Sequence, residues 1–420
     1  MSWSRLGTDA LGWCAGDLLP RLSMVHLTEG GLFMKCPACG TLDLSRFHSV
    51  DSVPVNSCVL LDDQSAARDF PRGDLRLSVC RRCGFVANTA FDPALTSYSQ
   101  DYEETQGFSP RFRQYIGELA RRWVARYGLE GRTVIELGCG KGEFIGEMLN
   151  AGVGHAIGVD PALRLDRVPP AASTSVTWVP GRFPEDFPVL DAPAVICRHT
   201  LEHIAPVGEW MRSVRAAIGR REDTVVLFEV PDVLPILERG AFWDLYYEHC
   251  SYFCSDSLEA LFRQCGFEPL DIYRTFDDQY LVIEARPSTT SRRPDFDRQP
   301  LSVPASASFA TSYDQLVKSW RSRLRRDSSA GGPTVIWGAS SKAVGFLTAL
   351  GPDAVHIAAA VDINPHKQGS YLPGTGHLIA PPKQLIDMAP ALVIAMNPTY
   401  LHEIYTELAQ LGVVTSLEAV

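Results

Sequence analysis

Three things that the sequence lacks narrow what this protein can be. No apolar run is long enough to cross a lipid bilayer, and the first residues lack a signal-peptide pattern, so we expect a cytoplasmic protein without a membrane partner. No block of lysine and arginine is present, and the formal net charge is −10, so a nucleic acid is not an expected partner. The 420 residues, 45% hydrophobic and 21% charged, predict a globular chain of about two to four domains. The sequence does not predict the oligomeric state.

Cysteine, by contrast, is well represented, with eleven residues. Two matched knuckles stand out, Cys-Pro-Ala-Cys-Gly at 36–40 and Cys-Arg-Arg-Cys-Gly at 80–84. Two such units can present four thiolates tetrahedrally to zinc, whereas core thiols or a redox pair would not explain the matched spacing. Four thiolates leave no open coordination position, so we predict a structural zinc ion rather than a catalytic one. The predicted ligands are Cys36, Cys39, Cys80 and Cys83.

Residues 134–144 read Val-Ile-Glu-Leu-Gly-Cys-Gly-Lys-Gly-Glu-Phe and carry the clearest motif. A short β-branched run is followed by a glycine at every second position and then by a helical pattern at 144–149. This order of strand, glycine turn and helix predicts the opening of a doubly wound, Rossmann-like α/β fold. In that fold ligands bind at the carboxyl ends of the strands.

Such a turn could bind either of two classes of cofactor, or it could be a structural turn that binds neither. A dinucleotide needs Gly-x-Gly-x-x-Gly to seat its pyrophosphate, but Glu143 occupies the third glycine position. S-adenosylmethionine (SAM) carries a sulfonium and an ammonium group, which suit the acidic Glu136 ahead of the glycines. Asp160 ends the next strand, where it can accept hydrogen bonds from ribose hydroxyls. The pattern resembles motif I of the class I SAM-dependent methyltransferases. The cofactor contacts that it implies are with Glu136, Gly138, Gly140, Gly142 and Asp160.

Polar residues follow the predicted fourth strand, at 194–197, and read Arg-His-Thr-Leu-Glu-His at 198–203. In a Rossmann-like methyltransferase this position faces the transferring methyl group. We therefore expect His199 beside the cofactor and His203 in the active site, although Glu202 and His203 could simply cap the next helix.

Residues 98–110 are polar and aromatic without clean periodicity, and they precede a helix predicted at 111–127. We interpret them either as a surface loop or as a lid over the cofactor site, with Tyr98 and Tyr102 as acceptor contacts.

Residues 242–253 gather aromatic side chains around Glu248 and His249. A buried imidazole beside a carboxylate can act as a general base, because the acid orients the ring and stabilises its charged form. Structural aromatic packing is the plainer alternative.

A second strand, turn and helix opens at 334–342. It follows a Pro-, Ser- and Arg-rich stretch at 286–304 and a helix predicted at 309–325. Its polar loop at 362–377 could bind a diphosphate through Lys342, Lys367 and backbone amides, or the unit could serve only as a wall.

Along the chain, the four-cysteine module is followed by the methyltransferase core and then by the second strand, turn and helix unit. This order resembles the sugar C-methyltransferases of deoxysugar biosynthesis, which methylate a carbon of a nucleotide-linked keto-sugar. The resemblance covers nearly everything from Cys36 onward. It implies His249 as the base that removes a proton beside a ketone, and Tyr246 and His203 as hydrogen-bond donors to the enolate. It also implies an acidic partner in Glu248 and a lid tyrosine in Tyr98 or Tyr102. The expected division is an extension, possibly disordered, at 1–31, a zinc-binding module at 32–92, a methyltransferase domain at 93–285, a linker at 286–304 and a second Rossmann-like domain at 305–420.

Two other functions stay open from the sequence. One is an O- or N-methyltransferase of another small metabolite, which would not need a base for a carbon acid. The other is a zinc-dependent assembly protein that binds SAM without turnover.

Overall fold

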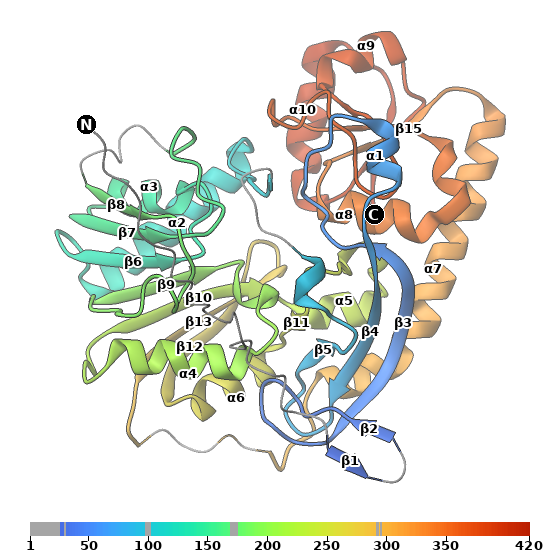
Figure 1. The fold of residues 1–420 in the computed structure, drawn as a ribbon. Helices are drawn as coiled ribbons and strands as arrows, with labels where there is room; N and C mark the ends of the chain where they lie inside the picture. The colour runs from blue at the N-terminus through green and yellow to red at the C-terminus, as the bar shows by residue number, and fades with distance from the viewer. Residues whose placement is uncertain (1–25, 29–30, 97–101, 169–174, 291–293, 295) are drawn as a thin grey trace, which may run out of the picture.

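The computed structural model describes residues 26–28, 31–96, 102–168, 175–290, 294 and 296–420 (Figure 1). Tyr98 and most of the predicted extension at 1–31 lie outside these ranges. Two short strands at the edge of that extension pair with each other in antiparallel fashion, β1 (His26–Thr28) and β2 (Gly31–Phe33). Within the described residues, no helix has both the length and the apolar character needed to cross a membrane.

The N-terminal module is a four-stranded antiparallel sheet in the order β11-β5-β4-β3. Its strands β3 and β4 form a long arm that runs beside helix α7 (Ser302–Ala330). The arm carries helix α1 to the C-terminal unit, the second α/β unit described below (Figure 1). There Gly374 donates a hydrogen bond to the carbonyl of Ala67. The arm thus connects the two cysteine knuckles to the far end of the molecule. The elements are β3 (Leu44–Pro54), α1 (Gln64–Arg68), β4 (Arg72–Cys80), β5 (Val86–Asn88), η1 (Pro93–Leu95) and β11 (Ser251–Tyr252).

The central sheet has seven strands in the order β12-β13-β10-β9-β6-β7-β8. Five are parallel neighbours, and β13 runs antiparallel to both β10 and β12. Helices cover both faces, which confirms the predicted Rossmann-like core. The strands are β6 (Thr133–Leu137), β7 (His155–Val159), β8 (Val176–Val179), β9 (Ala194–Arg198), β10 (Val225–Pro231), β12 (Phe267–Thr275) and β13 (Tyr280–Pro287). The helices are α2 (Pro110–Tyr127), α3 (Glu143–Asn150), η3 (Leu201–His203), α4 (Val207–Ile218), α5 (Val233–Arg239), η4 (Phe242–Asp244) and α6 (Ser255–Gln264).

Strand β9 shows why the central strands read as continuous apolar runs. Its residues alternate between two buried clusters, with Val195 and Cys197 on one face and Ala194 and Ile196 on the other. Because both faces are covered, neither needs polar side chains. The polar residues therefore begin where the strand ends, at the edge that forms the cavity described below.

The C-terminal unit is a second sheet of five parallel strands, in the order β16-β15-β14-β17-β18. Helix α7 is longer than the predicted 309–325 and begins at Ser302, inside the predicted linker. Pro304 is tolerated there because first-turn N–H groups have no intrahelical partner. The elements are α7 (Ser302–Ala330), β14 (Thr334–Trp337), α8 (Ser341–Leu350), η5 (Gly351–His356), β15 (Ile357–Val361), β16 (Ile379–Ala380), η6 (Pro382–Gln384), α9 (Leu385–Met388), β17 (Leu392–Ala395), η7 (Pro398–Tyr400), α10 (Leu401–Leu411) and β18 (Ser416–Ala419).

Candidate active site

One cavity of about 1870 Å³ joins the carboxyl end of the central sheet to the C-terminal unit. Its wall includes Glu136 and Asp160 from the central sheet and Lys342 and Asn364 from the C-terminal unit. A typical pocket for one small ligand has a volume of roughly 300–1,000 Å³. The cavity can therefore hold two ligands side by side, as a transfer reaction requires.

The glycine turn between β6 and α3 lies in this cavity. Gly138, Gly140 and Gly142 have φ angles of 74°, 53° and 76°, a left-handed conformation that side chains disfavour. A β-carbon at Gly138 would also collide with Thr200, and one at Gly142 with Trp178. The turn therefore needs glycine at each of the three positions.

Asp160 holds the turn in place. Its two carboxylate oxygens accept hydrogen bonds from the backbone N–H groups of Gly140, at 2.9 Å, and Ala162, at 2.7 Å. Burial raises the pKa of Asp160. The predicted ribose contact would use the remaining lone pairs of the same oxygens. Asp160 can therefore hold the turn and bind a ligand at the same time.

Glu136 places in the site a buried carboxyl oxygen without a hydrogen-bond partner in the described part of the chain. Its side chain is only 3% exposed, and Oε2 has no hydrogen-bond partner among the described residues. Burial raises the pKa of Glu136 to about 8. A buried carboxylate without a partner is costly, and a cationic ligand would relieve that cost. The residues present therefore fit the sulfonium and ammonium groups of SAM.

His199 lies at the cavity wall but is already paired. Its Nε2 is 2.6 Å from Oε1 of Glu229, an ion pair rather than a well-aligned hydrogen bond, and its Nδ1 is 3.6 Å from Glu202. Burial alone would lower the pKa of His199, but these carboxylates outweigh it and raise the pKa to about 9. A charged imidazole is a poor neighbour for a sulfonium. This geometry thus opposes the predicted direct contact with the cofactor.

Three predicted side chains meet around His249. Its ring lies edge-to-face with the rings of His203 and Tyr246, with centroids 4.8 Å apart in both pairs. Burial lowers the pKa of both histidines, that of His249 well below its usual value of 6.5. Both imidazoles are therefore neutral at pH 7 and line the cavity. A neutral ring is the form that can accept a proton.

Glu248 does not pair with His249, contrary to the prediction. Its Oε1 accepts hydrogen bonds from the backbone N–H of Ser57, at 2.8 Å, and from the Ser57 hydroxyl. Burial raises the pKa of Glu248 to about 7. Glu248 thus points toward the N-terminal arm that carries Ser57, whereas His249 lines the cavity. The predicted orienting role is wrong.

The backbone of Glu248 determines the state of His203 instead. The Nδ1 atom of His203 lies 3.1 Å from the Glu248 carbonyl. Because a carbonyl oxygen can only accept, Nδ1 carries the proton, and Nε2 of the neutral ring carries a lone pair. Neutral His203 therefore cannot donate to an enolate from Nε2, as the sequence had suggested. It can instead accept a hydrogen bond there.

Tyr246 and both predicted phosphate-binding lysines are also engaged within the protein. The Tyr246 hydroxyl donates to Asp244 at 2.8 Å, and Lys342 forms an ion pair with the same carboxylate. Lys367 is 2% exposed, donates to Ser340 and lies 3.6 Å from Asp362. These contacts oppose the prediction that the two lysines bind a diphosphate.

Asp362 repeats in the C-terminal unit what Asp160 does in the central sheet. It follows β15 and accepts hydrogen bonds from the backbone N–H groups of Ala339 and Asn364, both at 2.9 Å. Here, however, Lys367 neutralises the acid from within the fold. The turn after β14 is therefore held by an acid in the same way as the glycine turn after β6. Its acid, however, is paired with a lysine of the fold.

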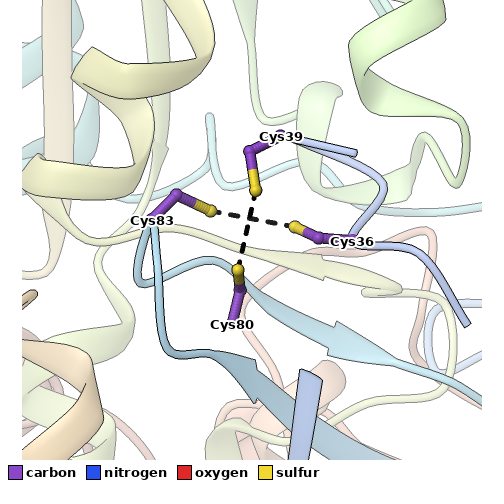
Figure 2. A group of neighbouring side chains, drawn as sticks. All are labelled: Cys36, Cys39, Cys80 and Cys83. Carbon is purple, nitrogen blue, oxygen red and sulfur yellow. Dashed lines mark hydrogen bonds between the residues drawn. The ribbon is translucent and has the colours of Figure 1, made fainter. Parts of the chain in front are cut away.

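Two groups of side chains have the composition of metal sites. The four predicted cysteines point toward a common centre (Figure 2), with Sγ atoms 3.7 Å apart for Cys36 and Cys83 and 3.6 Å apart for Cys39 and Cys80. Zn–S bonds of about 2.3 Å in a tetrahedron place sulfurs about 3.8 Å apart, so these residues fit zinc. In the second group one ligand atom from each residue lies within 4.8 Å of the others. That group comprises Glu202, His203 and His249.

Comparison with known proteins adds two family matches that cover different parts of the chain. Residues 109–272 match the model of a methyltransferase domain, and residues 301–414 match the model of a C-methyltransferase C-terminal domain. The C-methyltransferase NovU of Streptomyces niveus is 26% identical over 391 residues, which span 88% of this chain and 91% of NovU. The chain is a class I SAM-dependent C-methyltransferase.

Solved methyltransferase structures match this chain at low similarity. The N1-methyltransferase of 1,6-didemethyltoxoflavin from Burkholderia thailandensis is 19% identical, with a TM-score of 0.32 over 41% of this chain and 78% of that one. The magnesium protoporphyrin IX methyltransferase of Synechocystis PCC 6803 is 17% identical, with a TM-score of 0.34 over 42% of this chain and 84% of that one. Neither likeness bears on the acceptor of this methyltransferase.

The methyltransferase also has site residues that sequence reasoning missed. Lys141, inside the glycine turn, donates at 2.6 Å both to the carbonyl of Tyr102 and to Glu104. Glu104 lies so close to the turn that a β-carbon at Gly140 would be 2.7 Å from its carboxylate. Tyr102 itself is buried and lines the cavity, which supports the lid interpretation for this residue. The available signal was the pair of adjacent acids at 103 and 104 within the segment that we interpreted as a possible lid over the cofactor site.

The raised pKa of Glu136 generates a testable prediction. A cation beside Glu136 favours the carboxylate, so SAM binding near pH 7.5 should release protons as the pKa of Glu136 falls from about 8. Calorimetry in buffers of different ionisation enthalpy should record this release, and Glu136→Gln should reduce it and weaken binding. The exposed Asp166→Asn serves as the control. An unchanged proton release in Glu136→Gln would contradict the assignment.

Proposed function

We propose that this enzyme transfers the SAM methyl group to a carbon adjacent to a ketone, in a nucleotide-linked keto-deoxysugar. The observation that carries the proposal is the neutral, half-buried imidazole of His249 in the cavity wall. Carbon next to a ketone must lose a proton before it can attack, whereas an oxygen or nitrogen acceptor has a lone pair already. A base in this position therefore favours carbon methylation over the O- or N-methylation alternative.

In the proposed reaction His249 removes the α-proton, and the resulting enolate attacks the methyl group of SAM in line. The new carbon–carbon bond forms as the sulfonium–methyl bond breaks, the ketone is restored, and S-adenosylhomocysteine (SAH) leaves. We assign to His203 the role first given to Glu248. With its proton fixed on Nδ1 by the Glu248 carbonyl, its Nε2 can accept a hydrogen bond from the His249 imidazolium.

The acceptor assignment rests on the resemblance and on the size of the cavity. A volume of about 1870 Å³ leaves space for a large acceptor beside SAM, reaching toward the C-terminal unit. Because Lys342 and Lys367 are neutralised by Asp244 and Asp362, we propose that backbone amides near the start of α8 contact the nucleotide portion. Turnover of labelled SAM with candidate keto-sugars distinguishes the enzyme from a SAM-binding assembly protein.

We also propose that the four cysteines hold one structural zinc ion. The knuckle at 36–40 packs on the start of α4, where Gly208 donates to the Pro37 carbonyl at 3.1 Å. Zinc would thus fix the N-terminal module against the central domain, and through the arm that carries Ser57 it would support the position of Glu248.

The zinc proposal predicts a loss of stability with little change in chemistry. Cys80→Ser should lose the metal and unfold at lower denaturant concentration, because a missing ligand removes binding energy that contributes to folding. Cys265→Ser, a buried cysteine outside the cluster, is the matched control. Metal analysis of reduced, freshly purified protein should find one zinc per chain in wild type and in the control. Its absence from wild type would refute the proposal.

The base proposal predicts a specific defect in proton exchange. His249→Asn should lower kcat by about a hundredfold to ten-thousandfold and retain cofactor binding. With SAH in place of SAM, deprotonation proceeds without transfer, so exchange of the acceptor α-proton with deuterated water isolates the first step. We expect exchange to be suppressed in His249→Asn and unchanged in His155→Asn, which alters a histidine at the start of strand β7 that does not line the cavity. Exchange at the wild-type rate in His249→Asn would assign the base elsewhere, with His203 the first candidate.

A further inference from the structure

Residues 102–111, called the covering segment below, lie between the glycine turn and the C-terminal unit. On the cofactor side, Lys141 binds the Tyr102 carbonyl and Glu104, and Thr105 donates to Glu143 at the start of α3. Gly107 packs so closely on Glu143 that a β-carbon there would collide with it. The covering segment is thus seated directly on the turn that fits SAM.

The opposite side of the covering segment is held by the C-terminal unit. At its start, Asn364 donates to Oε1 of Glu103 at 2.8 Å, and these two side chains are 1% and 2% exposed. In the middle, the hydroxyl of Tyr400 donates to Gln106 at 2.9 Å. Two separate elements of the C-terminal unit supply these contacts, the loop after β15 and η7.

At its end, the covering segment is held by Glu403. One carboxylate oxygen accepts from the Ser109 hydroxyl at 2.8 Å, and the other accepts from the backbone N–H of Arg111 at 2.5 Å. Ser109 is the N-cap of α2, whose first-turn N–H groups have no intrahelical partner. A carboxylate there is stabilised by the helix dipole as well as by both hydrogen bonds. Glu403 therefore fixes the entry of α2 from a different domain.

We infer that the C-terminal unit is a working part of the cofactor site, with Asn364, Tyr400 and Glu403 as positioning residues that hold the covering segment over the glycine turn. None of them needs to touch SAM. They reduce the conformational freedom that the segment would otherwise lose when the cofactor binds, and that loss would weaken affinity. The inference rests on the SAM-binding turn and is independent of the acceptor proposed above.

The inference departs from both roles that the sequence suggested for the C-terminal unit, which were binding a diphosphate and serving only as a wall. The inference couples two events, the docking of the C-terminal unit on the covering segment and the binding of SAM. Because such coupling is reciprocal, each event strengthens the other by the same factor. Glu103 lies at the centre of the coupling, since it also pairs with Arg167 at 2.8 Å. Arg167 belongs to the segment that follows Asp160.

Calorimetric titration with SAH tests the inference. Asn364→Ala and Glu403→Ala should each raise the Kd for SAH by about tenfold, and Tyr400→Phe, which removes one hydroxyl and keeps the packing, should raise it by a smaller factor. Glu418→Ala is the matched control, because it breaks an ion pair with Arg323 that stays within the C-terminal unit. The control should lower thermal stability and leave the Kd for SAH within about twofold of wild type.

Hydrogen exchange shows whether the variants release the covering segment, and the Kd for SAH shows whether that release weakens cofactor binding. In Asn364→Ala and Glu403→Ala we expect faster exchange in peptides covering 102–111, and SAH should restore protection only at higher concentration. Faster exchange with an unchanged Kd would overturn the inference, because the segment would then be released at no cost to the cofactor. Wild-type protein that fails to bind SAH would instead refute the cofactor assignment and the inference with it. Tyr400→Phe keeps the test decisive if the alanine variants do not fold.

Discussion

The left-handed conformation of the glycine turn after β6 is the constraint on which the rest of the site depends. Because Gly138, Gly140 and Gly142 carry no side chains, the backbone can bend sharply under the edge of the sheet. The bend brings the N–H of Gly140 to Asp160 and leaves Oε2 of Glu136 buried without a hydrogen-bond partner among the described residues. Burial raises the pKa of both carboxyl groups, and a cationic cofactor beside them would favour their charged forms.

The acidic environment also explains why basic side chains near the cavity are neutralised from within. Lys141 binds Glu104, Arg198 pairs with Glu229, and Lys367 lies against Asp362. A free cation at any of these positions would compete with the sulfonium for the same carboxylates. The two Rossmann-like sheets illustrate the difference, since the turn before α8 has its acid neutralised internally, whereas the turn before α3 does not.

Three parts of the chain must meet before the acceptor side of the cavity is complete. Ser57, on the N-terminal arm, donates its backbone N–H and its hydroxyl to Glu248 of the central domain, and the Ser341 hydroxyl of the C-terminal unit lies 2.7 Å from the Ser57 hydroxyl oxygen. The backbone of Glu248 then fixes the tautomer of His203, which lies against His249. Residues far from the reacting atoms thus control protonation states within the site. The cysteine cluster contributes to this arrangement through the arm, not through chemistry.

The sequence alone determined those features that depend on local order along the chain. The glycine spacing, the acids that end two successive strands, the paired cysteine knuckles and the α/β alternation each lie within a short stretch, so spacing and residue type sufficed to predict them. The helix at 111–127 was placed to within one residue for the same reason.

Only the tertiary structure decided which side chains face one another. Adjacent positions 248 and 249 look like an acid–base pair in the sequence, but His249 lines the cavity whereas Glu248 binds a serine 191 residues away. Lys367 looks like a free cation until Asp362 and Ser340 surround it. Likewise, the contact between Asn364 and Glu103 joins residues 261 positions apart. Local patterns specify turns and ligand types, whereas partners at such separations are set by how the domains pack, and no periodicity encodes that.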